Sequence, residues 1–232
     1  MRKLGTAAAL ASALACAPAL RAQDLADYDY ENLAFRGVGL EYGYLWPDQV
    51  VPTPSYGVRM DLGYLGPGLR VTPSVSYWSS RMKRSEVARL ERRLDDLIIR
   101  QGSGAPIALG NIDRSDVAVA LDAHVVWRVP YGFLTFLGAG GAVHFLNGNG
   151  AAIADTFVED LLDSISAGLA LQTGIEYPVN RHIRLYGTGR LELLEDLRYA
   201  AVRGGLQIQL GGPTPDERPR PPARAPAPAP AR

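Results

Sequence analysis

The chain has 232 residues, of which 47% are hydrophobic, a share that is ordinary for a folded domain. Its 24 Lys and Arg residues balance its 24 Asp and Glu residues, so the formal net charge is zero. A general nucleic-acid binder needs a basic excess to displace counterions from phosphates, and this balance argues against a nucleic-acid partner. No run of about 18 apolar residues follows the N-terminal region, so no transmembrane helix is expected.

The N-terminal residues 1–22 have the pattern of a secretory signal peptide. A basic start precedes a short apolar stretch, and small residues allow cleavage after Ala22 or Ala19. A buried helix and lipoprotein processing at Cys16 are alternatives for the same segment. Cys16 is the only cysteine, so the exported chain would contain no disulfide.

From residue 34 the sequence alternates between apolar and polar residues, and this period of two predicts strands with one apolar face. Eight such segments are expected, at 34–46, 55–65, 69–80, 116–129, 132–146, 165–177, 182–193 and 197–210. Most of them exceed the usual length of strands in soluble sheets and reach the roughly nine to eleven residues that cross a bilayer at a tilt. Residues 23–33 would form a periplasmic segment before the first strand.

The connections between these strands alternate between tight turns and long loops. Short Gly- and Pro-containing turns fall at 66–68, 129–132 and 178–181, whereas the loops at 81–115 and 147–164 are long. Bacterial outer-membrane barrels alternate in this way, with short periplasmic turns and longer outside loops. The two long loops are therefore expected to be extracellular.

Both extracellular loops contain helical patterns. The segment from Ser85 to Gly102 places its apolar residues on one helix face, with Ser85 as an N-cap and Gly102 as a stop. The segment starting at Thr156 resembles a capping box and predicts a helix to about Leu162.

The two faces of the strands differ in character. One face is bulky and apolar, as in Leu40, Leu62, Val119 and Leu171, and the other is small, polar or charged. Eight strands leave an interior that is only wide enough for side chains, so the polar face fits inside and the bulky face fits lipid. A soluble lipocalin-like barrel, with the faces reversed, is the alternative. The membrane interpretation also places aromatic residues in two girdles, one at the outer strand ends (Trp46, Tyr56, Tyr77, Phe145 and Tyr199) and one at the inner ends (Tyr64, Trp127, Tyr131 and Tyr177).

The charged residues of the polar face are expected to pair inside the barrel, because an unpaired charge in a dry lumen is costly. Glu176 is expected opposite Arg184, and Asp61 is expected diagonal to Arg70. An ion-selective lining is the alternative role. The expected lumen charge network consists of Glu41, Arg59, Asp61, Arg70, Asp122, Arg128, Glu176, Arg184, Arg190, Glu192 and Arg203.

No residue pattern indicates catalysis, a metal site or a cofactor. His124 is expected opposite about Leu137 on the next strand, and His144 would then lie roughly 23 Å further along, too far to share an ion. Lipid A-modifying barrels need a Ser and a His within hydrogen-bond reach. The lipid A deacylases share a His-x-Ser segment, and neither His124 nor His144 is part of such a segment. The predicted helix in 81–115 is basic in its first half and could meet lipopolysaccharide phosphates, or could simply be a solvated face.

The signal, the hairpin layout and the alternation over 34–210 resemble the eight-stranded outer-membrane barrels typified by the OmpA transmembrane domain and OmpX. The last strand also resembles the signal that the barrel-assembly machinery recognises in such proteins, through Arg203, Gly205, Ile208 and Leu210. Two features depart from the family pattern: Leu replaces the usual aromatic residue, and the motif does not end the chain. The resemblance implies outer-membrane lipid, lipopolysaccharide and the assembly machinery as partners.

The segment 211–232 is rich in Pro, Ala and Arg and predicts a disordered periplasmic tail that could touch peptidoglycan or a periplasmic partner. In sum, the sequence predicts an all-β protein, a closed eight-stranded antiparallel up-and-down transmembrane barrel with helical insertions in its extracellular loops. We expect a non-enzymatic outer-membrane protein with a structural or surface-interaction role. A narrow passive pore and a lipid A-modifying enzyme are the alternatives.

Overall fold

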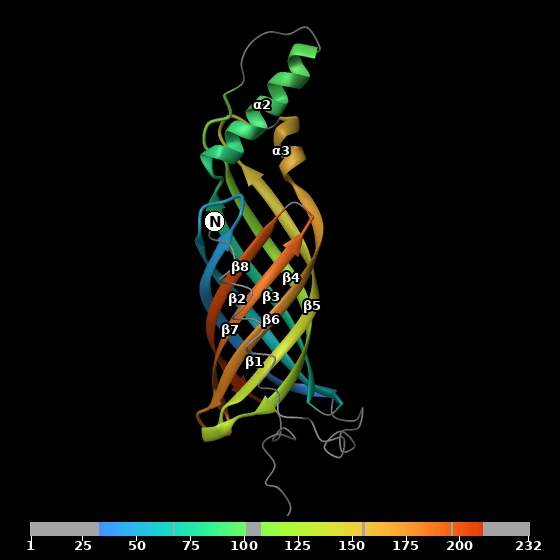
Figure 1. Ribbon diagram of the computed structural model, residues 1–232, viewed down its shortest axis with the longest axis vertical. Coiled ribbons are helices and arrows are strands. Elements are labelled where there is room, and N and C mark those ends of the chain that lie inside the picture. Colours follow the sequence, from blue (N-terminus) through green and yellow to red (C-terminus); the bar gives the residue numbers. More distant parts are fainter. Residues whose placement is uncertain (1–32, 67, 101–107, 155, 196, 211–232) are drawn as a thin grey trace, which may run out of the picture.

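The computed structural model describes residues 33–66, 68–100, 108–154, 156–195 and 197–210. The predicted signal peptide at 1–22, nearly all of the segment at 23–33 and the tail at 211–232 lie outside the described residues. The described part is a barrel whose helices gather at one end (Figure 1).

The barrel consists of eight antiparallel strands, each pairing with its neighbours in sequence order. β1 also pairs with β8, from Gly37 opposite Gln209 to Pro47 opposite Tyr199, and this pairing closes the sheet. The predicted fold class is therefore confirmed, and each strand lies within three residues of its expected bounds. The strands are β1 Leu33–Pro47, β2 Thr53–Gly66, β3 Leu69–Arg81, β4 Asp113–Arg128, β5 Leu134–Asn149, β6 Ser164–Pro178, β7 Ile183–Leu194 and β8 Arg198–Gln209.

Two helices lie in the long connections, as the sequence predicts, but the first begins at Arg84, so Ser85 is not its N-cap, and the predicted stop at Gly102 lies outside the described residues. α2 (Arg84–Arg100) lies between β3 and β4, and α3 (Phe157–Leu162) lies between β5 and β6. Thr156 caps α3, since its side-chain oxygen accepts a hydrogen bond from the Val158 amide at 3.3 Å. At the opposite end of the barrel, a short 3-10 turn, η3 (Pro130–Gly132), joins β4 to β5. Neither α2 nor α3 combines the length and the apolar character that a membrane-spanning helix needs.

The bulky apolar face of the sheet points away from the barrel axis. Leu40, Val119 and Leu171 are 66%, 47% and 54% exposed on the exterior. In contrast, Arg59 and Glu176 are almost completely buried in the interior. The structure therefore has the orientation predicted for a membrane barrel, and the lipocalin-like alternative is wrong.

A β-bulge near the end of β2 changes the position of Tyr64. The pairing with β3 shifts register between Arg59 and Tyr64, and Gly63 adopts a positive φ of 78° there. The extra residue reverses the alternation, so Tyr64 points inward and packs with Val126 and Phe136. The prediction that Tyr64 belongs to the inner aromatic girdle is wrong for this reason.

Tyr199 also lies inside the barrel, with a side chain only 4% exposed, so its assignment to the outer girdle is wrong. Tyr199 shares the inward face of β8 with Arg203, four residues further along, which places both side chains on one side of the strand. The other predicted girdle residues lie on the exterior, fully or partly exposed: Trp46, Tyr56, Tyr77, Phe145, Trp127, Tyr131 and Tyr177.

Above the strands, an apolar cluster closes the end of the barrel that carries the helices. α2 contributes Val87 and Leu94, and α3 contributes Val158 and Leu162. The cluster continues down into the barrel mouth through inward-facing residues of the strand ends. We call it the cap cluster; its other members are Leu45, Val50, Trp78, Met82, Leu109, Ile112, Leu146, Ile153, Leu194, Leu197, Tyr199 and Ala201.

Candidate functional site: the charged lumen

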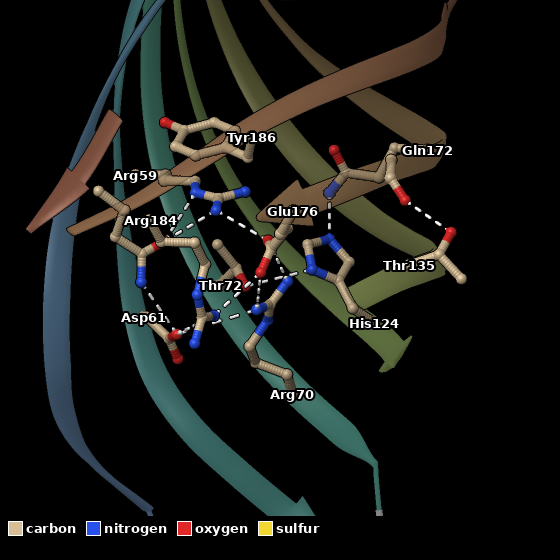
Figure 2. Close-up of polar contacts among 12 residues, drawn as sticks. Arg59, Asp61, Arg70, Thr72, His124, Thr135, Gln172, Glu176, Arg184 and Tyr186 are labelled. Atoms are coloured by element: carbon tan, nitrogen blue, oxygen red, sulfur yellow. Dashed lines mark hydrogen bonds and ion pairs between the residues drawn. The ribbon is translucent and has the colours of Figure 1, made fainter. Parts of the chain in front are cut away.

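The half of the lumen away from the helices is organised around one carboxylate, Glu176 on β6. Its side chain is fully buried and accepts hydrogen bonds from three arginines on three other strands. The N–O distances are 2.9 Å to Arg59, 2.7 and 2.9 Å to Arg70, and 2.9 Å to Arg184 (Figure 2). Such charge-assisted bonds are the strong hydrogen bonds of proteins, so this group ties β2, β3 and β7 to β6 across the lumen.

Asp61 is the second carboxylate of this group. It lies 3.9 Å from both Arg70 and Arg184, and the Gln207 amide donates to it at 3.1 Å. The amide of Gly63 also donates to Asp61 at 2.9 Å. The bulge that turns Tyr64 inward therefore also holds Asp61 in the lumen.

Aromatic rings lie over two of the three guanidinium groups of this half. The Cζ atom of Arg59 lies 3.3 Å from the centre of the Tyr186 ring, and that of Arg70 lies 5.4 Å from the centre of the Phe136 ring. Tyr186 in turn lies against the backbone at Gly205, where an added Cβ would come within 2.4 Å of the ring. The glycines of the polar face thus make room for large side chains from the opposite wall.

The half of the lumen toward the helices contains a second group of charges. Arg190 bonds to Asp122 at 2.8 Å and to Glu192. His144 lies between two carboxylates, with Nδ1 2.8 Å from Asp116 and Nε2 3.3 Å from Glu192. This chain of contacts links β4, β5 and β7 below the cap cluster.

The two groups contain most of the lumen charges that the sequence predicts. Arg203 and Glu41 complete the set, 3.5 Å apart on neighbouring strands. Arg128 is an exception: it sits at the last position of β4 and is exposed, so its assignment to the lumen network is wrong. Arg128 does follow the inward alternation of β4, but the strand ends at this residue and its side chain is exposed outside the lumen.

Two register predictions also need correction. Glu176 lies opposite Tyr186, and Arg184 lies opposite Pro178, so the Glu176–Arg184 ion pair is diagonal instead of directly opposite. His124 lies opposite Gly138 and not Leu137. Each shift is one or two residues, which is the uncertainty of placing the turn residues from sequence.

Sequence reasoning missed several members of the network. Asp116, His144 and Gln207 were not assigned to it, although Asp116 shares an inward face with Asp122, Gln207 shares one with Arg203, and His144 lies on the inward face of β5. Extending the alternation along each strand would have found them. The contacts between non-adjacent strands, such as Arg59 with Glu176, have no such signal, because they depend on how the sheet closes.

The histidines have partners other than a metal. His124 contacts Thr72 at 3.3 Å and also contacts Gln172, and its ring stacks on Phe136 with centroids 4.4 Å apart. Within the described residues, no group of three or more His, Cys, Asp or Glu side chains could hold a metal ion. The arrangement can pair buried charges and fill the barrel.

The fold and the lumen together define a closed eight-stranded β-barrel with an apolar exterior and a charged, hydrogen-bonded interior. No family model matches the sequence, and no curated protein matches it either.

The solved structures to which the chain is similar include three outer-membrane barrels. The first is Neisserial surface protein A (14% identity, 75% of this chain and 96% of that chain, TM-score 0.49). The second is Ail, the attachment invasion locus protein of Yersinia pestis (9% identity, 76% and 99%, TM-score 0.46). The third is the N-terminal β-barrel domain of Pseudomonas aeruginosa OprF (9% identity, 75% and 98%, TM-score 0.44). The function proposed for the chain rests on its own geometry.

Proposed function

We propose that this chain is an integral protein of the bacterial outer membrane, with a closed lumen and a structural or surface-interaction role. The observation that carries the proposal is the distribution of the two strand faces: large apolar side chains cover the outside, and paired charges fill the inside. In water this arrangement would expose a continuous apolar belt, whereas in a bilayer the same belt contacts hydrocarbon. Closure of the sheet also lets the backbone N–H and C=O groups of every strand pair with a neighbouring strand, which a sheet that spans a bilayer requires.

The pairing of opposite charges in the lumen favours a non-conducting barrel over a pore. Residues of both signs alternate along it and pair with one another, as in Arg190 with Asp122. A selective channel would instead present a ring of one sign to the passing ion. The cap cluster adds an apolar obstruction at the mouth that carries the helices.

α2 supports the surface-interaction role. Its buried face joins the cap cluster through Val87 and Leu94, which leaves Arg84, Arg92 and Arg93 exposed on the outside. These cations fit anionic partners such as lipopolysaccharide phosphates. We expect their replacement by Gln to change outer-membrane permeability without affecting barrel formation; unchanged permeability would count against this role.

The assembly motif belongs to the same proposal. Arg203 points into the lumen, Gly205 lies against Tyr186, and Ile208 and Leu210 are exposed on the exterior. An exterior hydrophobic pair at the end of β8 is available to the barrel-assembly machinery. The predicted tail contact with peptidoglycan or a periplasmic partner remains part of the proposal.

Two measurements test the proposal. On a gel, the unheated protein from outer-membrane fractions should migrate differently from the heated protein, because a closed barrel resists unfolding by detergent. In planar bilayers, the inserted protein should give no steady single-channel conductance. A protein recovered in the soluble fraction without a mobility shift would contradict membrane residence, and stable conductance would favour the pore alternative.

A further inference from the structure

The exterior of the barrel carries a groove near the end with the helices. It has a volume of about 310 Å³ and crosses β6, β7, β8 and β1. Four outward positions follow one another across these strands, because Leu171 pairs with Leu191, Leu191 with Ala200, and Ala200 with Trp46. Three of these side chains are large and one is small.

Ala200 is the reason for the hollow. Its neighbours Trp46 and Leu191 are 47% and 45% exposed and rise above the sheet, while Ala200 offers only a methyl group between them. Leu193 extends the same wall toward the strand end and is 52% exposed. The groove is thus apolar along its length, and it lies on the surface that faces lipid in the proposed function.

The outer end of the groove carries positive charge. Arg198 lies at this end with an exposed side chain. Lys83, just before α2, reaches the same place: its ammonium group donates to the backbone oxygens of Pro47 at 2.9 Å and Asp48 at 2.8 Å. Asp48 is also present, but one of its carboxylate oxygens already accepts from the Arg198 amide at 3.2 Å. Two cations beside one partly engaged carboxylate favour an anionic group at this position.

We propose that the groove binds one acyl chain of lipid A, with a lipid A phosphate at Arg198 and Lys83. The apolar hollow matches a hydrocarbon chain, and the cationic end matches the phosphate that lies at the level of the headgroups. The groove belongs to the half of the barrel that carries the helices, which is the outer-leaflet side in the proposed orientation, and lipid A is the lipid of that leaflet. This inference rests on the proposed membrane residence.

The test uses the full chain folded in detergent micelles, with folding confirmed first by gel mobility. Bisphosphorylated lipid A is added with an equal amount of phosphatidylglycerol, and the lipid that remains bound is identified by native mass spectrometry. We expect the unaltered protein to retain one lipid A molecule in preference to phosphatidylglycerol. Ala200→Leu, which fills the hollow, and Arg198→Gln, which removes a cation, should each lower the retained fraction about tenfold.

Two substitutions serve as matched controls. Ala123→Leu adds the same side chain to an exposed position on β4, away from the groove, and Arg128→Gln removes a cation at the opposite end of the barrel. Both should retain lipid A like the unaltered protein. Three outcomes would each overturn the proposal. They are a loss of lipid A from the control variants as large as that from the groove variants, no loss of lipid A from the groove variants, and retention of phosphatidylglycerol equal to that of lipid A by the unaltered protein. Because folding is established separately, these outcomes are distinct from a failure of the membrane proposal itself.

Discussion

The charge of Glu176 should be the largest single polar contribution to the stability of the barrel. Glu176→Gln keeps the size of the side chain but removes the negative charge that three buried arginines share. The nearest remaining carboxylate, Asp61, lies 3.9 Å from two of them. Breaking a buried ion pair from one side costs about 3–5 kcal/mol, so we expect a loss of that size in the free energy of unfolding.

The measurement is a urea titration of the folded protein in detergent micelles, with the folded fraction read from gel mobility. Glu41→Gln is the matched control, since it makes the same chemical change in a carboxylate with a single arginine partner at 3.5 Å. It should cost about 1–2 kcal/mol. Arg70→Met in the Glu176→Gln background should recover part of the loss, because it removes one of the three cations that lose their shortest ion pair in that variant. Equal losses for the two Gln variants, or no recovery in the double variant, would refute the idea that charge pairing dominates here.

Three further predictions concern the close packing of the lumen, the stability of the cap cluster and the outward orientation of α2. Gly205→Ala should destabilise the barrel by about 1–3 kcal/mol, because the new Cβ would lie 2.4 Å from the Tyr186 ring, whereas Gly204→Ala, with 3.8 Å to its nearest contact, should be nearly neutral in the same urea titration. Leu94→Ala should loosen the cap cluster and speed its proteolysis while the heat-dependent gel shift of the barrel remains, and Asp96→Ala on the exposed face should leave the proteolysis rate unchanged. Trypsin added to intact cells should cleave within α2, and protection of α2 would contradict the outward orientation.

The sequence predicted the strands and the direction of their faces because both follow from a period of two that is kept along most of each strand. The prediction failed for Tyr64, where the bulge at Gly63 inserts one residue and reverses the alternation. A bulge depends on pairing with the neighbouring strand, which the residues of β2 do not reveal alone. For Tyr199, the alternation with Arg203 did point inward, and the preference of aromatic residues for interfaces was given too much weight.

The candidate site was predictable only in part. Residues such as Asp122 and Arg190 could be assigned to the lumen from the face they occupy, but their pairing across the barrel could not. β4 and β7 are not neighbours, so the contact depends on strand tilt and stagger, which emerge only when the sheet closes. The same limit applies to Arg59 and Arg70 at Glu176, whereas Arg184, on the neighbouring strand β7, was expected there. Alternation thus predicts which residues enter the lumen, and closure decides which of them meet.

Toward the helices, the interior of this barrel changes from paired charges to the apolar cap cluster, and the proposed membrane location explains the change through the two surrounding solvents. In the proposed membrane location, apolar burial in the lumen would gain little, because lipid would already accommodate the apolar face, so paired charges can fill the interior. In the same proposed orientation the helices would lie beyond the membrane in water, where an apolar cluster is the stabilising arrangement. Trp78 and Tyr199 lie at the boundary: both belong to the cap cluster, yet Trp78 donates to Asp116 at 3.1 Å and Tyr199 meets the edge of His144 at 6.4 Å between ring centroids. Trp78→Ala should therefore weaken both parts at once, and Trp78→Phe, which keeps an aromatic ring but loses the N–H donor and some buried volume, should weaken both by less in the same urea titration.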